Sequence, residues 1–313
     1  MLKYVLKRIV GMLVVMAIVV TIVFLLVRVA PGDPAAVMLG PDATRQDIAQ
    51  LRDRLGLNDS LPKQYLVFVA QAASGDLGQS IFLNRPVGAA IFERAEPTLL
   101  LTALSLLIAC AIALPVGVLA AYWRGSIFDQ CATAAGMFLA SVPNFWLALI
   151  LIQGLAVSMG AFPVSGYGLP GASFGERLSH LVLPALSLGV VSSALIMRFT
   201  RASMLDVLGD EYVRTARAKG IGEARVVMRH AFKNALIPII TVVGMTAAIL
   251  ISGSVVIETV FGVPGIGNLV VNAVLRRDYP LIQGALLIVA ALYVIINFLI
   301  DMLYLLVDPR VRY

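Results

Sequence analysis

Long apolar stretches separated by polar segments dominate this sequence. A helix needs about 20 apolar residues to cross the hydrocarbon core of a bilayer, and a stretch of roughly 18 or more with few charges is typical of one. Six stretches reach this length, approximately Ile9–Val29, Thr98–Ala121, Thr133–Met159, Leu181–Phe199, Leu236–Ile257 and Leu281–Val307. The pattern therefore predicts an all-α, polytopic membrane protein with about six transmembrane helices.

The composition agrees with a membrane bundle. Of the 313 residues, 60% are hydrophobic and 13% are charged, whereas soluble domains are about 45 to 50% apolar and about 25% charged. Lys3, Lys7 and Arg8 precede the first stretch, as in a signal peptide, but its apolar core exceeds the usual length of about 7 to 15 residues. We therefore expect a retained helix. The net charge of +6 does not indicate nucleic-acid binding, because the basic residues lie beside apolar stretches.

Lys and Arg in the short connections predict the orientation, because positive charge in short loops is enriched on the cytoplasmic side. The short loops of one side hold only Arg177, Arg276 and Arg277. The other side holds Lys3, Lys7, Arg8, Arg124, Arg198, Arg201, Arg214, Arg217, Lys219, Arg225, Arg229, Lys233, Arg310 and Arg312. Both termini are therefore expected in the cytoplasm.

These assignments divide the chain into regions. The segment 30–97 is long enough to be exempt from the charge rule, falls outside by alternation, and contains predicted helices at Asp42–Leu55, near Pro41, and at Leu61–Ala73. The expected regions are residues 1–29 with the N-terminus and first transmembrane helix, 30–97 as a small external segment, 98–307 as a five-helix core containing the cytoplasmic loop 198–235, and 308–313 as a cytoplasmic tail.

Small residues and prolines inside the stretches predict how the helices pack. Pro115 and Pro143 either kink their helices or reflect the higher frequency of proline in membrane helices. Small residues at four-residue spacing let helix backbones approach closely. They occur at Ala109 with Ala113, Gly117 with Ala121, Ala132 with Gly136 and Ala140, and Gly244 with Ala248.

Side chains that carry chemistry are scarce. Polar residues at membrane depth are candidates for a transport path, and we select Asn144, Gln153, Asn272 and Gln283. The charges of Arg28, Glu258 and Asp301 are expected near the ends of spans. No nucleophile with a base, no metal-ligand spacing and no phosphate-binding Gly-x-x-x-x-Gly-Lys-Ser/Thr loop occurs; His180 and His230 fall on opposite faces, and Cys110 and Cys131 are expected to be packing residues. The sequence therefore predicts no catalytic, cofactor or metal site, and any energy for pumping must come from another subunit.

The polar stretch between the fourth and fifth spans, Arg198 to Asn234, has strong helix signals. Asp210 is a predicted N-cap for a helix Glu211–Lys219, and Gly220 is its predicted left-handed stop. A second helix is expected after Gly222 and leads to Pro238 at the next span. An alternative is an amphipathic hairpin held on the inner leaflet by anionic lipid.

Several motifs follow one another in a recognisable order. They are VRVAPGDPA at residues 27–35, LGLNDSLPKQY and GDLGQS within 55–80, EYVRTARAKG followed by RHAFKNALIPIIT in the cytoplasmic loop, ETVFGVPGIGNLVVNAVLRRDYPLIQG at 258–284, and DPRVRY at the C-terminus. Together they resemble the permease subunits of binding-protein-dependent ABC importers, in the dipeptide, oligopeptide and nickel branch. The general coupling motif of ABC importers has Glu-Ala-Ala where this chain has Arg214, Thr215 and Ala216, so only Ala216 and Gly220 match it.

The resemblance implies a type I ABC importer fold in a bacterial inner membrane, with roles for particular residues. The helix that couples to a cytoplasmic ATPase is expected at Asp210, Glu211, Tyr212, Arg214, Thr215, Ala216, Arg217, Ala218, Lys219 and Gly220. Arg214, Arg217 and Lys219 are expected to pair with acids on that partner, and the loop Trp123–Gln130 has a minor supporting role. The segment 30–97 and the loop 261–280, with Pro264, Gly265, Arg277 and Asp278, are expected to dock an external solute-binding protein.

The implied function is a membrane subunit that imports peptides together with a homologous permease subunit and two ATPase subunits, which hold ATP and Mg. This chain itself is expected to bind no cofactor and to be no enzyme. Nickel or a metal chelate, glutathione and opine-like solutes remain alternative cargoes. From other classes, a self-contained carrier or channel requires no ATPase, and a membrane enzyme requires reactive groups that are absent here.

Overall fold

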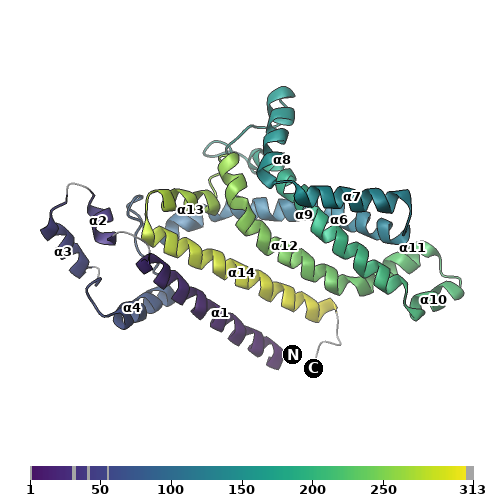
Figure 1. Cartoon of the computed structure of the whole chain (residues 1–313), viewed down its shortest axis with the longest axis horizontal. Helices are drawn as coiled ribbons and strands as arrows, with labels where there is room; N and C mark the ends of the chain where they lie inside the picture. Colours follow the sequence, from purple (N-terminus) through teal and green to yellow (C-terminus); the bar gives the residue numbers. More distant parts are fainter. Residues whose placement is uncertain (1, 30–32, 41–42, 55, 308–313) are drawn as a thin grey trace. The chain divides into compact units, whose positions relative to one another are not determined.

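The computed structural model describes residues 2–29, 33–40, 43–54 and 56–307, and these form helices joined by turns and loops (Figure 1). The helices are α1 Leu2–Val29, α2 Pro34–Leu39, α3 Arg45–Arg54, α4 Leu61–Ser74, α5 Val87–Glu93, α6 Ala95–Tyr122, α7 Ile127–Ser141, α8 Asn144–Leu151, α9 Phe174–Leu208, α10 Glu211–Ala218, α11 Glu223–Arg225, α12 Phe232–Val260, α13 Ile266–Leu275 and α14 Tyr279–Val307, with π-helical segments at Ile152–Ser158 and Val226–Ala231. Outside the described residues lie Pro41, Asp42 and Leu55 of the predicted external helix and the predicted tail 308–313.

Five of the six predicted spans are single long helices in the structure. Helices long and apolar enough to cross a membrane run over Val5–Val29, Val87–Tyr122, Phe174–Leu208, Glu223–Val260 and Tyr279–Leu303. Most start earlier than the apolar stretch alone predicts, because polar helical turns extend the spans. The chain has up to six spans if the bent pair α7 and α8 counts as one.

The predicted single helix Thr133–Met159 is wrong. Here α7 ends at Ser141, α8 begins at Asn144, and the two helices meet at an angle of 98° (Figure 1). Pro143 explains the break, since its ring disfavours helical backbone at the preceding residue, and Val142 is extended with φ −80° and ψ 125°. Pro115, by contrast, lies inside an uninterrupted α6.

The chain divides into two compact units. One comprises residues 2–96 with 268–295, and the other comprises 97–267 with 296–307. One boundary between the units falls at residue 97, and residues 268–295 belong to the same unit as the N-terminal residues. Hydrogen bonds between residues far apart in the sequence explain this: the Ser80 hydroxyl donates to the Asp278 carboxylate, and the Gln283 amide donates to the Val23 carbonyl at 3.3 Å.

In the first unit, α1 packs against α4. Phe24 meets the Tyr65 ring edge-on at 5.2 Å between centroids, and Arg28 donates to the Gln64 side chain at 2.7 Å. Thr44 and Asp47 form a reciprocal cap at the start of α3, and the Thr44 hydroxyl and N–H hold the pKa of the Asp47 carboxyl below its usual value. These contacts hold the helices between α1 and α5, and α4 matches the predicted helix Leu61–Ala73 closely.

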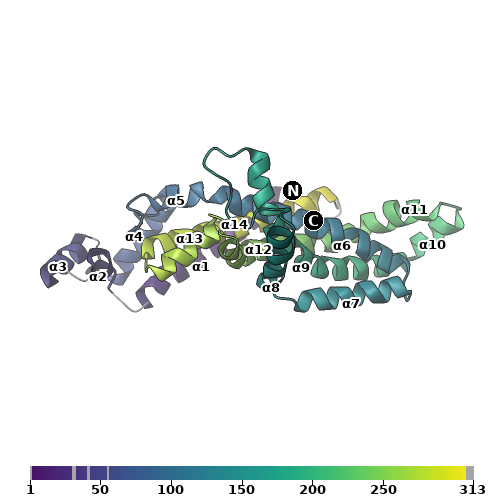
Figure 2. The same cartoon turned by 90° about the horizontal axis from the view of Figure 1, so that it is seen from above.

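In the second unit, α9 contacts α7, α8 and α12, and small residues line its approach to α6 (Figures 1 and 2). Ala109, Ala113 and Ala121 are buried on α6, as the spacing predicts, and so are Gly244 and Ala248 on α12. In the third predicted group only Gly136 is buried, whereas Ala140 is exposed. The small-residue stripe thus identifies the packed face of α6 and α12 correctly.

Replacing Gly117 with alanine is expected to lower the unfolding free energy by about 1 to 3 kcal/mol. An added Cβ would lie 2.7 Å from Thr200 Cβ and 2.8 Å from the Met197 carbonyl oxygen, so α6 and α9 must separate. Thermal unfolding of the purified protein in detergent measures this change. Gly175→Ala is the matched control, because no heavy atom lies within 4 Å of its added Cβ; equal melting temperatures for the two variants would contradict the packing argument.

Candidate functional site: a cytoplasmic docking helix

The short helix α10 ends in a well-formed glycine cap. Gly220 has φ +75° and donates its N–H to the Arg217 carbonyl at 2.9 Å, while Ile221 donates to the Ala216 carbonyl at 3.3 Å. This pair of bonds is a Schellman motif, in which a left-handed residue terminates the helix. The predicted glycine stop is therefore confirmed, although the helix ends one residue earlier, at Ala218.

The predicted aspartate cap is wrong in its chemistry. Asp210 occupies the N-cap position with extended backbone, φ −67° and ψ 147°, but its side chain accepts no capping hydrogen bond. Backbone bonds from Val213 and Arg214 to the Asp210 carbonyl open the helix instead. The helix start thus depends on the backbone path that leaves α9 rather than on the carboxylate.

One narrow face of α10 holds it to the rest of the loop. Val213 and Ala216 are buried there against Val226, and Ile221 completes this small apolar cluster. All other α10 residues are exposed, namely Glu211, Tyr212, Arg214, Thr215, Arg217 and Ala218, as are the flanking Lys219 and Gly220. The helix therefore presents a polar outer surface on a rigid apolar base, which is the arrangement a docking element needs.

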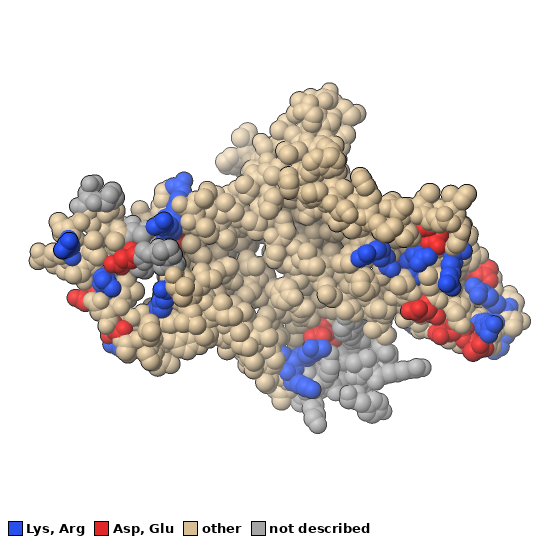
Figure 3. Space-filling model, in the orientation of Figure 1, with Lys and Arg blue, Asp and Glu red and all other residues tan. Residues whose placement is uncertain are grey.

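The outer surface is charged, and two of the three basic residues predicted to pair with acids on a partner already have acidic partners within the chain. Arg214 pairs with Glu211 at 2.7 Å, and Arg217 pairs with Glu223 at 2.9 Å. Both pairs are solvent-exposed, and such pairs contribute only about 0 to 1 kcal/mol, so they exchange readily for acids on a partner. Figure 3 shows charged side chains gathered over α10 and α11, whereas the surface over the middle of α9 and α12 is largely uncharged.

After α10 a short turn at residues 219–222 leads into the next long apolar helix. Glu223–Val260 is one long helical run, and it contains the π-helical turn Val226–Ala231. Tyr212 on α10 is tied to this run, because its hydroxyl donates to the His230 carbonyl at 3.3 Å and accepts from the Asn234 amide at 2.7 Å. Two hydrogen bonds thus join α10 to the helical run that continues as α12.

A second connection joins α9 to the first turn of α7. The Arg201 guanidinium donates to both carboxylate oxygens of Asp129, at 2.5 and 2.7 Å, and the Gly125 N–H donates to the same carboxylate at 2.9 Å. Asp129 is buried, with 4% of its surface exposed. Sequence reasoning assigned the loop Trp123–Gln130 a minor supporting role and missed this clamp, because its partners lie 72 residues apart.

Arg201→Ala is expected to destabilise the protein by about 2 kcal/mol, since it leaves a buried carboxylate without its counter-ion. The cost stays below the roughly 3 to 5 kcal/mol of a fully buried pair, because 27% of the Arg201 side chain is exposed. Thermal unfolding is again the measurement. Arg198→Ala removes an exposed arginine one helical turn earlier and should leave the melting temperature unchanged; a matching loss there would show that any lost arginine has this effect.

The four predicted path residues differ in their surroundings. The Asn144 Oδ1 atom, at the break between α7 and α8, is buried and accepts no hydrogen bond from the described residues. Gln153 is exposed on the π-helical segment that follows α8, and Asn272 is exposed on α13, where it donates to Asn268. Gln283 is bonded to α1, as described above, so its amide already has a role in packing.

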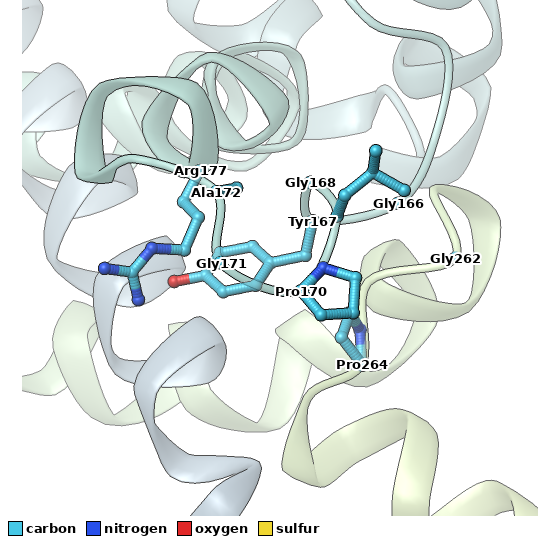
Figure 4. A pocket seen from close by; sticks show the side chains of 10 residues that line it. Gly166, Tyr167, Gly168, Pro170, Gly171, Ala172, Arg177, Gly262 and Pro264 are labelled. Atoms are coloured by element: carbon cyan, nitrogen blue, oxygen red, sulfur yellow. The ribbon is translucent and has the colours of Figure 1, made fainter.

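The four predicted external residues separate into surface and interior. Arg277 is exposed, with φ +56°, and Pro264 lines a pocket of about 620 Å³ together with Tyr167 and Arg177. Figure 4 shows the Tyr167 ring in this pocket directed toward the Arg177 side chain. Gly265 and Asp278 are buried, which makes them supports of the loops that carry them rather than contact residues.

The sequence placed Glu258 near the end of a span and did not predict the hydrogen-bond network around it. Glu258 is fully buried, and its Oε1 accepts from the Thr98 hydroxyl at 2.7 Å and the Ser254 hydroxyl at 3.1 Å. Thr98 in turn accepts from the Ile266 N–H at 2.8 Å. An added Cβ at Gly265 would collide with the Glu258 carboxyl, so glycine there lets the turn close over it. The available signal was the spacing of Glu258 and these glycines in ETVFGVPGIG.

Comparisons with known proteins agree with this architecture. Residues 113–313 match the family described as binding-protein-dependent transport system inner membrane component, and residues 1–102 match the N-terminal family of the same transport-system membrane components. The probable peptide ABC transporter permease protein y4tP of Sinorhizobium fredii is 44% identical over 310 residues, which cover 99% of each chain. The glutathione transport system permease protein GsiC of Escherichia coli is 40% identical over 313 residues, which cover 100% of each chain.

A solved structure supports the fold independently. An inward-facing structure of the MetNI methionine ABC transporter matches with a TM-score of 0.59 and 20% identity, over 70% of this chain and 96% of that one. The family matches and the two relatives together show that the chain is a membrane permease of an ABC importer. The chain belongs to the family of binding-protein-dependent transport system inner membrane components. It is a transport subunit and not itself an enzyme.

Proposed function

We propose that this chain is one of two related membrane subunits that form the translocation path of a peptide importer, driven by two cytoplasmic ATPase subunits and supplied by an external solute-binding protein. ATP and Mg bind to the ATPases, and no cofactor binds to this chain. Both termini lie in the cytoplasm of a bacterial cell, with the chain in the inner membrane. The geometry of α10 is the observation that carries the proposal, because an exposed helix on an apolar base, hydrogen-bonded through Tyr212 to the helical run of the next span, suits transmission of force from a soluble motor.

In this proposal α10 occupies a cleft in an ATPase subunit, and Arg214, Arg217 and Lys219 exchange their local contacts for acids on that subunit. Closure of the ATPases then moves α10 as a unit, and Tyr212 and the π-helical turn pass the motion to α12. The broken span at Pro143 places Asn144 beside a bend, where a change of helix angle alters access to the path. Alternating access requires such a movable element.

Peptides are the proposed cargo. Two relatives that match along essentially the whole chain carry printed names for peptide and glutathione transport. Glutathione is itself a small peptide, so a short peptide-like solute with a carboxylate is the chemistry common to both names, and glutathione is the second candidate. Metal chelates receive no support from the described residues, which contain no group of three or more His, Cys, Asp or Glu positioned for a metal ion.

The test is to express the tagged chain with its neighbouring genes, purify it in mild detergent and identify the accompanying proteins by mass spectrometry. Recovery of a second multi-pass permease and one or two ATPases supports the proposal. Proteoliposomes of that complex should take up a labelled dipeptide or glutathione only with ATP and the binding protein present. A chain that purifies alone and transports without ATP would instead be a self-contained carrier.

A further inference from the structure

A small cavity in the first unit has not been assigned a role above. Its volume is about 200 Å³, and it lies between the loop around Phe82, the end of α5 and one side of α13. Arg94 and Arg276 contribute guanidinium groups to its wall, and Asn272 contributes an amide. Asn272 and Arg276 are four residues apart, so they follow one face of the helical run. The wall is therefore rich in hydrogen-bond donors.

Arg276 is held in place by an aromatic ring. Its guanidinium carbon lies 3.5 Å from the centre of the Phe82 ring, and the Phe82 N–H donates to the buried Asp278 carboxylate at 3.1 Å. Stacking uses the face of the guanidinium and leaves its N–H edge free to bind a planar anion. Within the described ranges, no ion pair to Arg94 or Arg276 is present, unlike Arg85, which pairs with Glu93 at 2.8 Å.

Asp278 is the one acid that lines the cavity, and its charge is already balanced. It is 1% exposed and accepts from the Ser80 hydroxyl at 2.5 Å and the Leu281 N–H at 3.2 Å, in addition to Phe82. These donors and the start of α14 stabilise its negative charge. Two guanidinium groups without acidic partners therefore face a single, fully bonded carboxylate, and the cavity favours an anion.

We infer that this cavity binds a single carboxylate group. A guanidinium edge matches a carboxylate with two parallel hydrogen bonds. The volume is below the roughly 300 Å³ of pockets for larger ligands, so it suits one residue-sized group: the C-terminal carboxylate of a peptide or an acidic side chain of a docking protein. Its external position rests on the proposed orientation, in which Arg276 is one of few basic residues in the short outer loops.

The test measures binding to the intact transporter in nanodiscs of zwitterionic lipid, by hydrogen exchange of residues 266–281. Dialanine with a free C-terminus and dialanine amide are the first probes, and the peptide-free solute-binding protein is the second. Protection by dialanine but not by its amide supports the inference with a peptide as the source. The dialanine concentration needed for protection should then rise on the order of tenfold in Arg276→Gln and in Arg94→Gln. Protection by the binding protein but not by dialanine, weakened in the same two arginine variants, supports the inference with an acidic side chain of that protein as the source.

Arg85→Gln is the matched control, since it removes an external guanidinium outside the cavity and should bind as the wild type does. Arg276→Lys keeps the charge but loses the planar edge, and an intermediate weakening is expected. Equal binding of dialanine and its amide, or unchanged binding by both arginine variants, would overturn the inference. The proposed function fails separately, through co-purification without ATPases, because hydrogen exchange can be measured on the chain in any assembly.

Discussion

Gly220→Pro is expected to reduce ATP-driven transport by about a hundredfold and to release the ATPase subunits during purification. Proline fixes φ near −65° and has no N–H, whereas Gly220 has φ +75° and donates to Arg217. A conflict of this kind costs about 3 kcal/mol or more, which corresponds to about a hundredfold lower population of the capped helix. Co-purification and ATP-dependent uptake in proteoliposomes are the measurements.

Gly222→Ala is the control for this variant. Gly222 has φ −60° and ψ 140°, which alanine adopts without strain, and no heavy atom lies within 4 Å of an added Cβ. The melting temperature of the membrane region should be unchanged in both variants, because α10 contacts the rest of the chain mainly through its small apolar cluster, the exposed Arg217–Glu223 pair and the exposed hydrogen bonds of Tyr212. Normal ATPase recovery and uptake with Gly220→Pro would refute the assignment of α10 as the docking helix.

Glu258→Ala is expected to lower the unfolding free energy by roughly 3 to 5 kcal/mol, the largest stability effect among these variants. The change leaves a cavity and removes the acceptor of two buried hydroxyl groups, those of Thr98 and Ser254. The turn that begins α13 then loses its support on α12. Thermal unfolding and the yield of monodisperse protein report this loss.

Two comparisons separate this network from a general effect of losing an acid. Glu258→Gln keeps the size of the side chain and one acceptor oxygen, so it should retain most of the stability. Glu93→Ala removes an exposed glutamate from a surface pair, a change worth about 0 to 1 kcal/mol. If Glu258→Ala has the same melting temperature as Glu93→Ala and the wild type, the buried network has no structural importance.

The sequence predicted much of this protein because several of its features are local. Span length and apolar content depend on a continuous stretch, and small residues four apart identify a packed helix face, as on α6. The end of α10 follows from Gly220, since its left-handed backbone is a property of glycine in one short turn. The order of motifs predicted the family that the comparisons confirm.

The same local reasoning failed where one residue dominated or where partners were distant. Pro143 breaks a stretch that hydropathy alone joins, because a proline effect outweighs a run of apolar residues. Asp210 satisfies the capping pattern, yet its side chain accepts no capping hydrogen bond after the chain leaves α9. Arg214 and Arg217 are paired within the chain, since neighbouring acids reach them first.

By itself, then, the sequence determined the class of protein, five of the long apolar helices and the end of α10 at its glycine, because these depend on composition and short-range pattern. Only the tertiary structure decided which carboxylates are buried and which residues they bind. Glu258 meets Thr98 across 160 residues, Asp278 meets Ser80 across 198, and Asp129 meets Arg201 across 72. Burial and hydrogen bonding of a carboxylate depend on which distant segments pack around it, and no local pattern in the chain specifies that.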